Sequence, residues 1–196
     1  MNRFAKLLEK LLFTPSRNAK IIAMAEYFEN TPDPDRGFAL GAITRDLSLN
    51  NLKPTQLRTL AKSRVDPELF DMSYDYVGDM AETISLIWPK HTHHVLEKQR
   101  LPQLGELISA LQTKSKIALQ TYVTELLDCA SVTERWAIIK LVTGGLRVGV
   151  SARLAKSSLA EYSGKDLTEI EKIWHGIAVP YLSLIHISEP TRQPTI

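Results

Sequence analysis

The segment LVTGGLRVGVSAR, residues 141–153, combines a helix end, a glycine-rich connector and a new helix start. Glycine after Thr143 suits the left-handed conformation that closes many helices, and Ser151 is a residue type that caps helix N-termini. The small residues between them let the backbone approach a ligand closely, and the helix start offers free N–H groups and a positive dipole end. The neighbouring cations are Arg147, Arg153 and Lys156. These features predict a clamp for phosphate groups, and the alternative is a helix–loop–helix with solvated basic residues.

Helical periodicity extends on both sides of this segment, with turn residues between the periodic stretches. Proline at the first helical position predicts helix starts at Pro54 and Pro67. Two further starts, at residues 131–134 and 166–169, have the spacing of a capping box. The other expected helices span 2–12, 17–29, 38–43, 79–88, 101–112, 115–129, 132–143, 152–162 and 167–177. With no useful strand alternation and no fixed repeat, the sequence predicts an all-α compact globule of about ten short helices.

The composition is that of an ordinary globular protein, with 196 residues, 44% of them hydrophobic and 23% charged. This length fits one domain with a real core, or at most two small ones. A single cysteine, Cys129, excludes an intramolecular disulfide and favours a reducing compartment, and its apolar setting predicts a buried hydrophobe. No apolar run reaches the roughly 20 residues of a membrane span, and the N-terminus lacks a signal-peptide core, so we expect a cytoplasmic protein.

The net charge is only +2, but the charges are segregated along the chain. Residues 135–160 contain no acid, and residues 1–20 contain a single one, Glu9. The basic residues of these two stretches are Arg135, Lys140, Arg147, Arg153 and Lys156, and Arg3, Lys6, Lys10, Arg17 and Lys20. A segregated basic surface suits a polyanion better than the net charge implies.

Three histidines lie close together on a polar stretch without a nearby cysteine. They are His91, His93 and His94. Such a set makes a poor metal site, so a solvated loop is favoured over a metal centre or a metal-dependent hydrolase. The glycines at 144–149 are not followed by Gly-Lys-Ser/Thr, which excludes a nucleotide-binding P-loop.

Two other residue sets have ordinary explanations. An aspartate recurs every four residues at 71, 75 and 79, which fits a solvated helix face or helix caps better than an acid–base pair. The three tryptophans have apolar helical settings and are expected in the core rather than as base-stacking platforms. They are Trp88, Trp136 and Trp174.

The last fifteen residues differ from the rest of the chain. Residues 182–192, LSLIHISEPTR, lack a helical period and resemble the translation of a transposon-end sequencing adapter. We therefore expect residues 182–196 to be a non-native tail and residues 1–181 to form the domain. The alternative is a genuine C-terminal extension.

Several stretches resemble the N-terminal DNA-binding domain of ATP-dependent DNA ligases, in the order found in that family. Residues 144–151, GGLRVGVS, resemble its LRxG segment. Residues 4–20 resemble its opening helix pair, and residues 76–83, YVGDMAET, resemble its GD segment before a short helix. Trp174-His175-Gly176 near the end is most similar to the bacterial branch. The resemblance covers residues 1–181, and the ordered set is more specific than any single motif.

The resemblance implies a three-part enzyme. In that family the helical domain grips duplex DNA across the minor groove, an adenylation domain takes AMP from ATP on a lysine, and an OB-fold closes around the nick, with Mg²⁺ assisting. It implies nick sealing in DNA repair, replication or recombination, with ATP and Mg²⁺ as cofactors of the full-length enzyme. The adenylation motif Lys-x-Asp-Gly is absent here, and the nearest string, residues 164–167, lacks the glycine. We therefore expect an inactive fragment without catalytic residues, cofactor or metal, and without the adenylation and OB-fold domains.

The expected partner is double-stranded, nicked DNA, bound by a monomer through the phosphate backbone. The residues expected to bind it are Thr143, Gly144, Gly145, Arg147, Gly149, Ser151, Arg153, Lys156, Arg17 and Lys20. The alternative, from another class, is a helical protein-interaction module without nucleic-acid binding. The acid-free basic stretch beside a glycine connector favours DNA.

Overall fold

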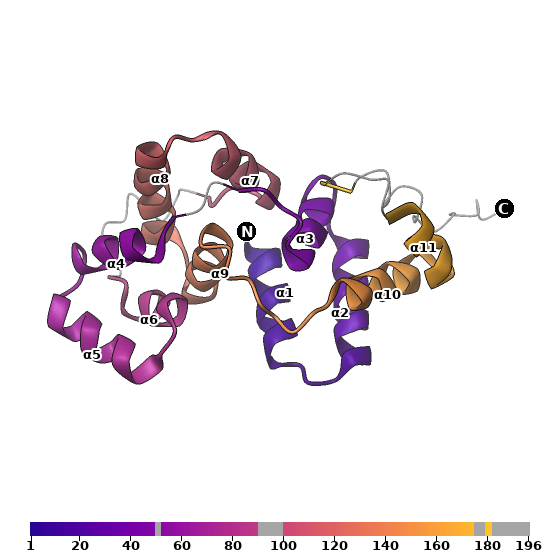
Figure 1. The fold of residues 1–196 in the computed structure, drawn as a ribbon, viewed down its shortest axis with the longest axis horizontal. Helices are drawn as coiled ribbons and strands as arrows, with labels where there is room; N and C mark the ends of the chain where they lie inside the picture. Colours follow the sequence, from indigo (N-terminus) through magenta and orange to yellow (C-terminus); the bar gives the residue numbers. More distant parts are fainter. Residues whose placement is uncertain (50–51, 90–99, 175–178, 182–196) are drawn as a thin grey trace. The chain divides into compact units, whose positions relative to one another are not determined.

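The computed structural model of the chain describes residues 1–49, 52–89, 100–174 and 179–181. Over these ranges the chain forms eleven α-helices and no strand (Figure 1). The prediction of an all-α fold is therefore confirmed. The chain divides into two compact units, residues 1–6 with 48–146 and residues 7–47 with 147–196, and each is described by itself.

The first unit contains six complete helices and the first residues of a seventh. They are α4 (Pro54–Lys62), α5 (Pro67–Val77), α6 (Met80–Ile87), α7 (Leu104–Thr113), α8 (Lys116–Cys129), α9 (Val132–Val142) and the start of α1 (Asn2–Phe13). Helix α6 packs against α9 and α5, and side chains such as Phe70, Ile84 and Leu107 are fully buried. The Leu52 N–H donates to the Val142 carbonyl at 3.0 Å, which fixes the segment before α4 to the end of α9.

The second unit contains the rest of α1 together with α2 (Arg17–Asn30), α3 (Asp35–Thr44), α10 (Ala152–Ser163) and α11 (Leu167–Trp174). Helix α10 is its centre, because it packs against α2, α3 and α11. The core includes Met24, Phe28, Leu40, Leu159 and Ile170, all fully buried. Segments far apart in the sequence thus form one core around the helix that follows the glycine connector.

Helices α2 and α10 pack against each other and cross at a wide angle (Figure 1). The Ser158 hydroxyl lies 3.9 Å from the Met24 sulfur, and the Tyr162 ring meets the Phe28 ring edge-on with centroids 6.2 Å apart. The segment just before α10 also contacts the first turn of α2, because the Lys20 ammonium donates to the carbonyls of Val148 and Gly149.

The expected helix boundaries hold to within a few residues, with two informative differences. The helix expected at 101–112 begins at Leu104, because Gln103 and Glu106 form a capping box there. The helix expected at 38–43 begins earlier, at Asp35. The capping box at 131–134 is confirmed, and at 166–169 the Asp166 carboxylate accepts hydrogen bonds from the N–H and hydroxyl of Thr168. The three histidines, residues 175–177 and the tail 182–196 lie outside the described residues.

Candidate nucleic-acid interface

The first half of the connector terminates α9. Gly144 has a φ of 68°, in the left-handed region. Its N–H donates to the Leu141 carbonyl at 3.2 Å, and the Gly145 N–H donates to the Lys140 carbonyl at 3.0 Å, which is the pattern of a Schellman motif. The Thr143 hydroxyl also donates to a carbonyl of its own helix. The donors of residues 143–145 are therefore used in ending the helix, and its left-handed φ accounts for the glycine at 144.

The second half of the connector, from residue 147 on, belongs to the second unit. Arg147 is exposed, Val148 is buried, and Gly149 is exposed with a φ of 65°. The Lys20 side chain is only 8% exposed, and its ammonium donates to the Val148 carbonyl at 2.9 Å and to the Gly149 carbonyl at 3.1 Å. This burial gives Lys20 a position different from that expected of a surface phosphate ligand.

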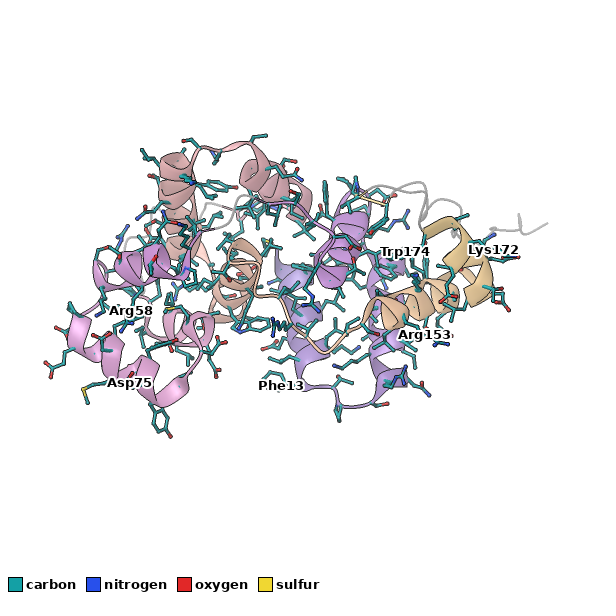
Figure 2. The ribbon with its side chains drawn as sticks, in the orientation of Figure 1. Phe13, Arg58, Asp75, Arg153, Lys172 and Trp174 are labelled. Carbon is teal, nitrogen blue, oxygen red and sulfur yellow. The ribbon has the colours of Figure 1, made fainter. Side chains whose placement is uncertain are left out.

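Helices α2 and α10 each begin with a serine cap. The Ser151 hydroxyl accepts a hydrogen bond at 3.2 Å from the N–H of the third residue of α10, and the Ser16 hydroxyl does the same for α2 at 3.3 Å. Neither helix has an acidic residue in its first turn, so the positive ends of both dipoles are not neutralised there. Arg17 and Arg153 are exposed in these first turns, and Arg153 extends from the outer side of α10 (Figure 2).

Lys156 lies one turn further along α10 and is half-buried. Its ammonium lies 5.2 Å from the centroid of the Trp174 ring, and that ring packs against Tyr181 with centroids 4.9 Å apart. The cation–π contact holds Lys156 against α11. Its ammonium is thus more constrained than the guanidinium groups of Arg147 and Arg153.

Two cations of the acid-free stretch 135–160 have internal partners. Arg135 is 5% exposed, its Nε donates to the Leu127 carbonyl at 2.7 Å, and burial lowers its pKa. The Lys140 ammonium donates to Asp79 at 2.5 Å. Burial is the largest influence on Asp79 and raises its pKa, but hydrogen bonds from Lys140 and from the Glu82 N–H together hold the pKa below its usual value. The basic surface expected from this stretch therefore reduces to Arg147, Arg153 and Lys156.

The other candidate residues have structural roles. Asp79 caps α6, and Asp71 accepts hydrogen bonds from Lys62 and Arg58, which lower the pKa of its carboxyl. The cap prediction is thus confirmed for Asp79, whereas the ion pairs of Asp71 were not predicted. Cys129 is half-buried rather than buried, and burial raises its thiol pKa. Over the described ranges, His, Cys, Asp and Glu side chains form no group of three that could hold a metal ion.

A family model described as DNA ligase N terminus matches residues 1–160. The chain belongs to the DNA ligase N-terminal family. A search of curated proteins found no match. The matched residues of this ligase domain include both halves of the connector and the starts of α2 and α10. In the part of the ligase domain that the structure describes, no helix is long and apolar enough to cross a membrane.

The structure adds two features of the ligase domain that sequence reasoning missed. One is the packing of α2 against α10, which joins two serine-capped helices in one core. The other is the ammonium of Lys20 under the connector. The sequence signal for the first was the serine before each helix combined with acid-free first turns, but nothing in the sequence indicated that the two helices pack together.

Proposed function

We propose that this ligase domain binds duplex DNA through its phosphate backbone, at the starts of α2 and α10 in the second unit. The observation that carries the proposal is the packing of two serine-capped helices with acid-free first turns, where Lys20 of α2 holds the connector that leads into α10. First-turn N–H groups and the helix dipole favour anions, and here the connector before one such end contacts the first turn of the other helix through Lys20.

The charged side chains around these helix starts support the same ligand. Arg17, Arg147 and Arg153 are exposed, and each guanidinium can hold a phosphate with two parallel hydrogen bonds. Contacts of this kind fix the position of a protein on the duplex and carry little sequence information. We therefore expect binding with little sequence preference.

The roles of the DNA-binding residues expected from the sequence differ. Arg17, Arg147, Gly149, Ser151, Arg153 and Lys156 are proposed to face the phosphates. Thr143, Gly144 and Gly145 use their donors in ending α9, so we propose that they set the start of the connector.

For the intact enzyme we propose ATP-dependent sealing of nicks in DNA repair, replication or recombination. The adenylation motif Lys-x-Asp-Gly does not occur in the 196 residues, so the chemistry with ATP and Mg²⁺ would belong to another part of the enzyme. The ligase domain would then supply the grip on the duplex, acting as a monomer.

The test is fluorescence anisotropy of labelled nicked and intact duplexes across a salt series. We expect binding that weakens steeply with salt, because each neutralised phosphate contributes about 0.9 to the slope of log affinity against log salt. Two duplexes of unrelated sequence should bind alike. Absence of binding to either duplex at low salt would contradict the proposal and would favour a protein-interaction module.

A further inference from the structure

Lys20 is a lysine whose charged end lies inside the second unit. It occupies the first turn of α2, is 8% exposed, and donates to two consecutive carbonyls at 2.9 and 3.1 Å. In the described part of the chain it has no carboxylate within ion-pairing distance. Burying an ammonium is unfavourable unless its donors are satisfied, so this contact fixes the orientation of both peptide groups.

The orientation of the carbonyls determines where the neighbouring N–H groups point. The peptide bonds from Val148 to Val150 are trans, and in a planar trans peptide the N–H points opposite to the C=O. Because the carbonyls of Val148 and Gly149 point at Lys20, the N–H groups of Gly149 and Val150 point away from it. Neither N–H has a protein acceptor in the described ranges.

Gly149 is matched to this contact in two ways. Its φ of 65° is a conformation that side chains rarely adopt, and a Cβ at this position would lie 2.7 Å from the Lys20 ammonium nitrogen. A side chain at 149 would therefore both strain the backbone and displace the lysine. The contact between Lys20 and the backbone at Gly149 thus keeps the N–H groups of Gly149 and Val150 pointing away from Lys20.

We propose that Lys20 is a positioning residue, which turns the N–H groups of Gly149 and Val150 toward a phosphate of the bound duplex. This inference rests on the proposed DNA binding and deepens it. Successive N–H groups that face one way form a concave site for anions. If the two peptides were reversed, carbonyl oxygens would face the phosphate and repel it. Lys20 acts from beneath the connector and does not itself contact the ligand.

The experiment compares Lys20→Met, which keeps the aliphatic stem but removes the donors, with Lys10→Met. Lys10 is exposed and paired with Glu26 at 2.9 Å, so its replacement changes net charge equally without touching the connector. We expect Lys20→Met to bind duplex DNA about tenfold more weakly, the size of a lost hydrogen bond to a charged group. Lys10→Met should change affinity by less than about twofold.

Two further variants separate positioning from folding. Lys20→Arg keeps the donors and should restore affinity to within about threefold of the parent. Gly149→Ala should reduce DNA affinity about as much as Lys20→Met. The double variant should bind DNA as tightly as the single variant of lower affinity, because both substitutions act through one contact. If Lys20→Met does not fold, the DNA affinities of Lys20→Arg and Gly149→Ala still test whether the contact between Lys20 and the connector is needed.

Amide NMR with inorganic phosphate tests the orientation without DNA. In the parent, the Gly149 and Val150 amide resonances should shift on phosphate addition, and in Lys20→Met these shifts should be lost. A folded Lys20→Met that binds DNA like Lys10→Met would overturn the inference and leave the proposed function intact. If the parent binds no DNA but shows Lys20-dependent amide shifts with phosphate, only the proposed function is overturned. If the parent shows neither DNA binding nor these shifts, both the proposed function and the inference are overturned.

Discussion

Replacing Arg147 and Arg153 together by alanine tests the interface most directly. Both side chains are exposed, one in the connector and one in the first turn of α10, and neither has an ion-pair partner among the described residues. Their removal should therefore change the charge of the interface without leaving a buried group unpaired. Stability should change by less than about 0.5 kcal/mol, as is usual for surface substitutions.

The expected magnitude follows from the number of phosphates released. Each contact contributes about 0.9 to the salt slope, so loss of both should flatten the slope of log affinity against log salt by about 1.8. A fourfold rise in salt, from about 50 to about 200 mM, then reduces the affinity ratio of parent to variant about twelvefold. The variant should also lose affinity equally for unrelated sequences.

The assay is anisotropy of labelled duplexes at five or more salt concentrations, with a matched control. Arg100→Ala with Lys116→Ala removes two exposed cations from the first unit and produces the same change in net charge. The control should keep the parental slope to within a few tenths, because its cations lie outside the proposed interface. If the Arg147/Arg153 variant keeps the parental slope, or the control loses as much, the phosphate contacts lie elsewhere.

Three other predictions concern the cap, the tail and the chemistry. Ser151→Ala should lower the free energy of unfolding by about 1 kcal/mol, because the α10 cap is lost; an unchanged thermal melt would show that the cap contributes nothing. Deletion of residues 182–196 should leave the melt unchanged and improve solubility, since 182–187 is an uncharged, largely apolar run; a loss above about 2 kcal/mol would show that the tail packs on the fold. Incubation with radiolabelled ATP and Mg²⁺ should leave the chain unlabelled, because it has no Lys-x-Asp-Gly, and a covalent AMP adduct would refute this expectation.

Helices were predictable because their signals are local. The Ser131–Glu134 capping box and the prolines at 54 and 67 act within one turn, and the structure places helix starts at each. The start at Leu104 was mistaken because Leu101 continues the apolar period, whereas the helix begins only after Gln103, whose N–H donates to the Glu106 carboxylate at 2.7 Å. Glutamine is not a typical N-cap residue, so the sequence did not mark the boundary there.

The candidate site was less predictable because burial of a cation depends on distant residues. Lys20 contacts carbonyls 128 and 129 residues away, and Arg135 donates to the carbonyls of Leu127 and Trp88. Lysine and arginine are exposed in most settings, so the sequence alone favoured a surface position for both. Arg147 and Arg153, for which the described residues offer no internal acceptor, are exposed as expected.

The acid-free starts of α2 and α10 also bear on how fast a polyanion would be captured. With a net charge of only +2, the chain exerts little long-range attraction on DNA. The acid-free first turns of α2 and α10, however, leave partial positive charge beside Ser16 and Ser151. The field of a duplex would attract these charges and turn the second unit so that they face the DNA, within roughly a Debye length, about 8 Å at physiological salt. Productive encounters are then selected by orientation before any arginine touches a phosphate.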